Sequence, residues 1–215
     1  SCSGNGFNIG AANIVLDCAS YAINYTTAGN GGYGINNTAG YDNVTIKNCN
    51  IVAGDSAGPN QKSIYFKNVD NSLINNNNIT TMSWNYPSAI TLENSSNNII
   101  TNNREDLIGV TYYSEAILIG SFSNNNTIEN NIINISGQGS NYGIYISSSS
   151  NNTIKNNSIT NIYSASSPFS VIYITGSSSE SNDIIDNTLT GRIKPTIYFI
   201  LDGTNIARNN NISNN

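Results

Sequence analysis

The 215-residue sequence contains no histidine, one methionine, one tryptophan, four prolines and three cysteines. The lack of histidine, and of cysteine pairs at metal-ligand spacing, argues against a zinc or copper site, so we assign no metal ligands. Charged residues make up only 10% of the chain, the net charge is −5, and the eight basic residues are scattered. Nucleic-acid binding needs clustered Lys and Arg, so we expect no nucleic-acid partner. No apolar run is long enough to predict a membrane span.

Asparagine, in contrast, accounts for 43 residues, and much of it lies in one recurring phrase. The phrase reads NNTIENNII at 125–133 and NNTIKNNSI at 151–159, with weaker copies along the chain. Its first apolar position recurs every 23 to 30 residues, at Leu16, Ile46, Ile74, Ile100, Ile128, Ile154, Ile184 and Ala207. A period of this length is the signature of a solenoid.

A second short run precedes each copy of the phrase, as in SIYFKN (63–68) and GIYISS (143–148). Apolar and other residues alternate in these runs, which is typical of a strand with one buried face. No stretch of 12 or more residues shows a helical period. The sequence therefore predicts an all-β chain: a right-handed, single-stranded parallel β-helix of about eight rungs, with 23 to 30 residues in each. We expect one domain over residues 1–215, and leave open that it is a fragment of a longer chain.

The second half of each phrase places an asparagine at a bend between two strands. Asparagine tolerates the left-handed backbone region, and its amide can both donate to and accept from the same residue in neighbouring rungs. We therefore expect a structural ladder, with Cys49 as the equivalent residue of an earlier rung, formed by Asn77, Asn103, Asn131, Asn157, Asn187 and Asn210.

The three cysteines and the glycosylation motifs bear on the cellular setting. Cys18 and Cys49 are about one rung apart and could form a disulfide, whereas Cys2 could instead reach Cys18 within the first coil. Either bridge would suit an extracellular or cell-surface protein. Among the Asn-x-Ser/Thr motifs, Asn24 and Asn36 are the glycosylation candidates that we place at exposed turns.

The opening FNIGAANIVLDCASYAI, followed by GYGINNT and NVTIKNCNI, resembles the entry coils of the right-handed parallel-β-helix-repeat proteins. This group includes NosD-type periplasmic proteins, pectate-lyase-like enzymes and many secreted or surface proteins, and the resemblance covers roughly residues 9–212. It implies the fold, but the group hosts lyases, epimerases, hydrolases, adhesins and surface-layer components. The segments YGIN (33–36) and YGIY (142–145) are similar to a Tyr-Gly start in epimerases, but the acidic and histidine residues that should follow are absent.

Two groups of residues are candidates for a functional site. The outward position of the alternating run carries Tyr65, Tyr145, Tyr173 and Tyr198, which predicts an aromatic stripe for sugar binding, for protein contacts or for stacking alone. The segment 102–118 departs from the repeat and holds the densest charge group, with Arg104, Glu105, Asp106 and Glu115 as weak catalytic candidates. Such a group could bind Ca²⁺ and support lyase-like chemistry, or it could be a solvated loop with a local ion pair.

These observations favour an extracellular or cell-surface structural protein of the surface-layer, filament or adhesin type, and they lean against an enzyme. The expected partner is another copy of the chain, end to end or laterally, with glycans as a further candidate. The alternative is a carbohydrate-active β-helix, meaning a polysaccharide lyase, epimerase or hydrolase, or a glycan-binding module. Apart from Ca²⁺, no cofactor is expected.

Overall fold

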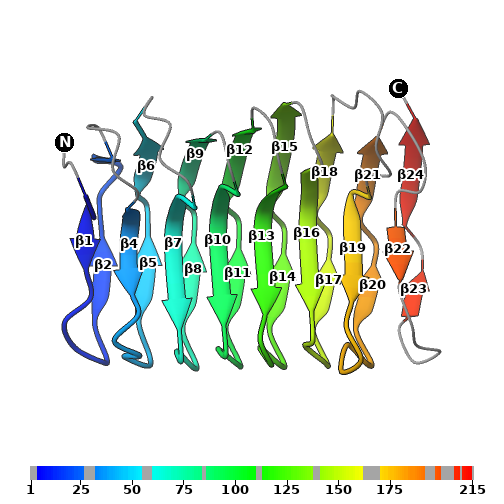
Figure 1. Ribbon diagram of the computed structural model, residues 1–215, viewed down its shortest axis with the longest axis horizontal. Helices are drawn as coiled ribbons and strands as arrows, with labels where there is room; N and C mark the ends of the chain where they lie inside the picture. Colours follow the sequence, from blue (N-terminus) through cyan, green and yellow to red (C-terminus); the bar gives the residue numbers. More distant parts are fainter. Residues whose placement is uncertain are drawn as a thin grey trace.

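The computed structural model describes residues 4–26, 32–54, 60–83, 86–109, 113–137, 141–161, 170–191, 197–199, 206–208 and 210–214. Within these ranges all regular structure is strand, arranged as three parallel sheets of eight strands each. One coil of the chain contributes one strand to each sheet, and the coils stack side by side into an elongated solenoid (Figure 1). The described part contains no helix that could span a membrane.

Sheet A is built from the first strand of every coil: β1 (Phe7–Asn8), β4 (Tyr33–Asn37), β7 (Lys62–Lys67), β10 (Ser88–Glu93), β13 (Ser114–Gly120), β16 (Asn141–Ser147), β19 (Ile172–Thr175) and β22 (Ile197–Phe199). Sheet B contains the short second strands: β2 (Val15–Asp17), β5 (Thr45–Lys47), β8 (Leu73–Asn75), β11 (Ile99–Thr101), β14 (Thr127–Glu129), β17 (Thr153–Lys155), β20 (Asp183–Ile185) and β23 (Ile206–Arg208). Sheet C contains the third strands: β3 (Ala22–Tyr25), β6 (Asn50–Ala53), β9 (Asn78–Ser83), β12 (Arg104–Gly109), β15 (Ile132–Gly137), β18 (Ser158–Asn161), β21 (Thr188–Gly191) and β24 (Asn211–Asn214). In Figure 1 the strands of sheet A run downward in front and those of sheet B return behind them while the chain advances from left to right, so the coil is right-handed.

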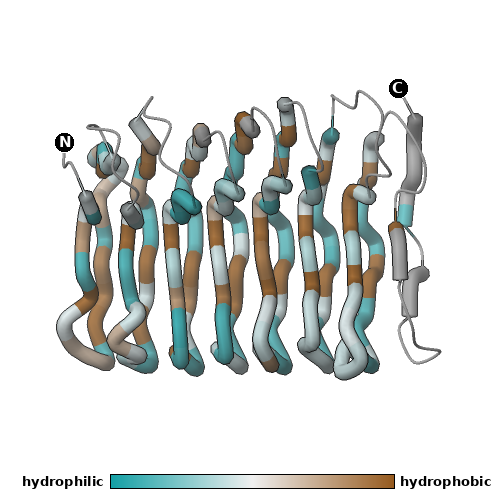
Figure 2. Tube along the Cα trace, in the orientation of Figure 1, coloured by the Kyte–Doolittle hydropathy of each residue, from teal (hydrophilic) through white to brown (hydrophobic). Residues whose placement is uncertain are grey.

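The register of sheet B is the one that the asparagine phrase predicts. Parallel pairing places Ile74 beside Ile100, and then Ile128, Ile154 and Ile184 in line. These side chains are fully buried and belong to one hydrophobic core that runs the length of the solenoid. Figure 2 shows the same arrangement as hydrophobic bands that recur at the same height in successive coils. The stacking of like side chains thus fixes the fold.

The predicted asparagine ladder is present at the bend between sheets B and C. Asn131 is typical: its Nδ2 donates to Asn157 Oδ1 at 3.0 Å and to the Ile100 carbonyl at 3.0 Å, and its Oδ1 accepts from the backbone and side chain of Asn103. The equivalent side-chain bonds connect the other members, and the Cys49 backbone donates to Asn77 Oδ1 in the position expected of it. The ladder satisfies buried polar groups that would otherwise be left without partners at every bend.

The left-handed residue of the bend is not the ladder residue itself. It is the residue before it, with φ between 53° and 56°: Asn48, Asn76, Asn102, Asn130, Asn156 and Asp186. Each bend therefore needs two residues with different tasks, one to turn the backbone and one to bond inside the core. This division explains why asparagines occur there in pairs.

Sequence reasoning missed two further ladders at the bend between sheets A and B. One contains asparagines, and there Asn126 Nδ2 donates to Asn152 Oδ1 at 3.1 Å and Asn152 Nδ2 donates to Asn182 Oδ1 at 3.0 Å. The other is a column of buried serines, in which each hydroxyl accepts from the backbone N–H one coil earlier, that of Val69 for the first serine and that of the preceding serine for the rest: Ser95, Ser123, Ser149 and Ser179.

A disulfide joins Cys18 to Cys49, with their Cα atoms 4.7 Å apart. The stacking of adjacent coils brings the two residues together, so the first of the two predicted pairings is the observed one. Cys2 lies outside the described residues.

Candidate functional site

The outward column of sheet A has the predicted register. Tyr65 pairs with Thr91, Thr91 with Leu118, and Leu118 with Tyr145, after which Tyr173 and Tyr198 continue the line. Of Tyr198 only the backbone lies within the described part. The tyrosines fall into two groups, because Thr91 and Leu118 interrupt the column.

Within these groups the tyrosine rings pack mainly against one another. The centroids of Tyr142 and Tyr173 are 4.9 Å apart, and those of Tyr145 and Tyr173 are 5.4 Å apart with nearly parallel planes. Tyr65 meets Tyr33 edge to face at 5.0 Å and is only 7% exposed. The ring faces are used in these contacts, and the Tyr65 hydroxyl donates to the Glu93 carboxylate, so the column leaves few ring faces open for a ligand.

A glutamate and a lysine accompany the tyrosines on this face. Glu115 lies one rung from Tyr142 and two rungs from Lys62 along one register column. Burial raises the pKa of Glu115 to about 7, although the positive charge of Lys62 opposes the increase. Burial also lowers the pKa of Lys62. Perturbed groups of this kind are a feature of functional sites, and they are also found in structural ion-pair networks.

We expect the Glu115 carboxyl to titrate near pH 7. A ¹³C NMR titration of the side-chain carboxyl should show this midpoint, whereas a midpoint near the ordinary value of 4.5 would contradict the described burial. In the K62M variant the midpoint should move upward, because a charge that favours the carboxylate has been removed. The raised pKa means that Glu115 favours the folded state below pH 4.5, and that this contribution is lost as the pH rises toward 7.

The four charged candidates between 104 and 115 do not form one site. Arg104 and Asp106 lie on the outer face of sheet C as a two-bonded ion pair, with Nε and Nη2 each 3.0 Å from a carboxylate oxygen. Glu105 points into the core, pairs in register with Ile79 and Ile133, and is fully buried. Glu115 lies on sheet A. The expectation of a solvated loop is wrong for residues 104–109, which form strand β12, but the local ion pair is confirmed.

The charge group between residues 104 and 115 is one of two candidates for a functional site in the sequence, with Ca²⁺ binding as one interpretation. Among the described residues, no three His, Cys, Asp or Glu side chains are gathered closely enough to hold a metal ion. The Ca²⁺ hypothesis therefore remains a prediction without a defined ligand set.

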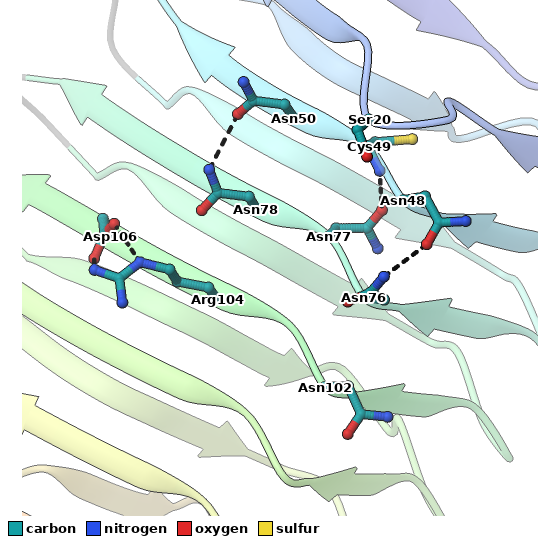
Figure 3. Close-up of a pocket in the computed structure, with 10 residues that line it drawn as sticks. All are labelled: Ser20, Asn48, Cys49, Asn50, Asn76, Asn77, Asn78, Asn102, Arg104 and Asp106. Carbon is teal, nitrogen blue, oxygen red and sulfur yellow. Dashed lines mark hydrogen bonds and ion pairs between the residues drawn. The ribbon is translucent and has the colours of Figure 1, made fainter.

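A groove of about 560 Å³ lies at the bend between sheets B and C, across the first four coils (Figure 3). Arg104 and Asp106 are in its wall, and the remaining lining is almost entirely asparagine, with Asn76 and Asn78 as exposed members. The groove is lined by Ser20, Asn48, Cys49, Asn50, Asn76, Asn77, Asn78, Asn102, Arg104 and Asp106. Its two charged side chains neutralise each other, so the lining is polar without a net charge.

The groove asparagines hold one another in place and keep part of their hydrogen-bonding capacity. Asn76 Nδ2 donates to Asn48 Oδ1 at 2.7 Å, and Asn78 Nδ2 donates to Asn50 Oδ1 at 3.2 Å. An amide has two N–H donors and an oxygen with two lone pairs, so each bond uses only part of what the amide offers. The groove therefore displays fixed donors and acceptors that repeat from rung to rung, about 4.8 Å apart.

Sequence reasoning did not single out the groove residues as a binding surface, although a signal was present. The first asparagine of each pair must point outward if the second bonds inside the core, and successive coils then align these outward amides. The concavity could not be read from sequence, because it depends on the angle between sheets B and C.

The two glycosylation candidates do not lie at turns as expected. Asn24 is exposed in strand β3, and Asn36 is half-buried in strand β4, where its Nδ2 donates to Asn8 Oδ1 at 2.9 Å. Glycosylation at either residue stays a prediction.

The architecture defines the chain as a parallel β-helix protein. No protein-family profile matches it, and no curated protein is similar in sequence. Among solved structures it is similar to the A-module of the mannuronan C-5 epimerase AlgE4 from Azotobacter vinelandii, with 12% identity and a TM-score of 0.39 over 97% of this chain and 74% of that one.

Proposed function

We propose that this protein is an extracellular β-solenoid that binds an uncharged glycan in the groove between sheets B and C, without cleaving it. The observation that supports this most is the lining itself, which consists of fixed amides and a neutralised Arg104–Asp106 pair. Sugar hydroxyls both donate and accept hydrogen bonds, and they match amides that retain both capacities. The Cys18–Cys49 disulfide supports an oxidising compartment.

The chemistry of the groove also favours neutral over acidic sugars. Both Arg104 bonds to Asp106 are already made, so a uronate would have to compete with a carboxylate held at 3.0 Å. A neutral glycan avoids this competition, and its binding should depend little on ionic strength, because screening acts on charges.

Binding can be tested with a panel of neutral and acidic oligosaccharides, followed by calorimetry on the best ligand. We expect N76G combined with N78A to weaken binding of a neutral oligosaccharide about 10-fold or more, since two hydrogen bonds of about 1 kcal/mol each are lost. The matched control is N156G, which replaces an exposed left-handed asparagine of the same bend outside the groove. A chain that binds no neutral glycan, or groove variants that bind as well as the control, would overturn the proposal.

A second candidate function, structural assembly at the cell surface, is favoured by a different face. The outer surface of sheet B exposes apolar side chains, with Val15 at 62% and Ile99 at 42%. Apolar residues in line on a sheet face suit lateral contact between solenoids.

A further inference from the structure

The outer face of sheet B carries two columns of side chains. They flank the buried isoleucine column on either side, and strand alternation points both away from the core. In the first six rungs the residues of the first column are apolar or threonine, and Asp183 continues the column in the seventh: Val15, Thr45, Leu73, Ile99, Thr127 and Thr153. In the same six rungs the second column is polar and largely charged, and Ile185 follows in the seventh: Asp17, Lys47, Asn75, Thr101, Glu129 and Lys155.

The charges of the second column are arranged in two ion pairs with two neutral residues between them. Lys47 Nζ is 3.2 Å from Asp17, and Lys155 Nζ is 2.9 Å from Glu129. Along these six rungs the signs of the second column therefore read minus, plus, neutral, neutral, minus, plus, and the seventh rung, with Asp183 and Ile185, lies beyond this pattern. Read in the opposite direction, every sign is reversed.

This pattern is complementary to itself under one arrangement. If a second copy faces the first with its solenoid axis reversed, each column meets its own counterpart in the opposite order. Asp17 then faces Lys155 of the second copy, and Lys47 faces its Glu129. In the first column Leu73 faces Ile99 of the second copy, so the apolar residues meet at the centre.

We propose that the outer face of sheet B is the contact surface of an antiparallel homodimer, whose two-fold axis runs along the strands between the rungs of Leu73 and Ile99. Each end of the interface is a quartet of alternating charges, in which every charge has an opposite charge both beside it and across from it. The proposal gives the assembly function a defined surface and is independent of glycan binding in the groove.

The size of the face sets the expected strength. Six rungs span roughly 25–30 Å and three strand residues about 10 Å, which is smaller than the standard interface of about 800 Å² per partner. We therefore expect a dimer with a Kd weaker than about 1 μM, which dissociates further as ionic strength rises.

Charge exchange tests the arrangement by sedimentation equilibrium, from micromolar to millimolar protein at low salt. The single variants K47E and E129K each place like charges across the interface and should weaken dimerisation about 10-fold or more. In the double variant K47E/E129K the introduced carboxylate faces the introduced ammonium, so dimerisation should return toward the wild-type level. Circular dichroism of each variant checks that the fold is kept.

The double variant separates contact between copies from pairing within a chain. It breaks both intrachain ion pairs, because it places two acidic residues together at one end of the column and two basic residues at the other. If the charges mattered only within one chain, the double variant would associate no better than either single variant. That result, or a wild-type protein that stays monomeric at millimolar concentration, would overturn the proposed dimer while leaving the groove proposal untouched.

Discussion

Replacing Glu105 with isoleucine will raise the free energy of unfolding at pH 7 by about 3 kcal/mol or more, and Tm by several degrees. Glu105 occupies a core position of sheet C where the neighbouring coils place Ile79 and Ile133. Its side chain is fully buried, and neither carboxyl oxygen has a hydrogen-bond partner. The variant removes two unsatisfied polar atoms and restores the apolar column, so both changes act in the same direction.

The E105Q variant separates ionisation from burial. Burial, with a smaller contribution from the nearby Asp106 charge, holds the pKa of Glu105 well above its ordinary value of 4.5. The folded state therefore retains a proton that the unfolded chain releases, and stability is lost as the pH rises from 4.5 through the folded pKa. E105Q should match the wild type at pH 4 and exceed it at pH 8. Glu115 contributes in the same direction, so the difference between variant and wild type is the quantity to compare.

Chemical denaturation at several pH values measures both effects. If E105I proved less stable than the wild type across this range, Glu105 would have to make stabilising contacts that the structure does not contain.

Replacing Asn131 with alanine should lower the free energy of unfolding by about 4 kcal/mol. This change is as large as the one expected for Glu105 but has the opposite sign. Four buried groups lose a partner: the Asn103 backbone N–H, the Asn103 side-chain amide, the Ile100 carbonyl and Asn157 Oδ1. Each lost bond costs about 1 kcal/mol, because no water replaces the amide inside the core. Asn103 Nδ2 keeps its bond to the Ile74 carbonyl, and Asn157 Oδ1 keeps the bond from the backbone N–H of residue 131.

The matched control is N130G, one residue earlier. Asn130 has φ of 56° and is exposed, and glycine adopts that conformation without strain. We expect this variant to stay within about 0.5 kcal/mol of the wild type in urea denaturation followed by circular dichroism. An N131A variant as stable as N130G would mean that the ladder bonds do not contribute to stability.

Much of the fold could be predicted from the sequence, because a solenoid places each residue beside its counterpart one period away. The column through Ile74, Ile100 and Ile128 follows directly from the spacing of the asparagine phrase. The Cys18–Cys49 pairing was one of two predicted options and followed from the same period, whereas the Cys2–Cys18 option would lie within the first coil.

Sequence reasoning missed features that depend on which way a side chain points and on which of the three sheets carries it. Glu105 looked like a break in the pattern, whereas the backbone keeps its register and carries a carboxyl into the core. Arg104 and Glu115 are close in sequence but belong to different sheets, so a charge cluster along the chain is not a cluster in space. The polar groove was beyond sequence reasoning for the same reason, since four coils and two sheets must meet to form it.

The most direct test of this account is an NMR measurement of side-chain amide contacts in the interior. Stacked coils place the amide of Asn131 between those of Asn103 and Asn157, with donor and acceptor 3.1 Å and 3.0 Å apart. We predict nuclear Overhauser effects that link these three side-chain amides in sequence, together with slow exchange of their protons with solvent. Three amides that show no mutual contacts and exchange as fast as exposed asparagines would contradict the stacked-coil structure.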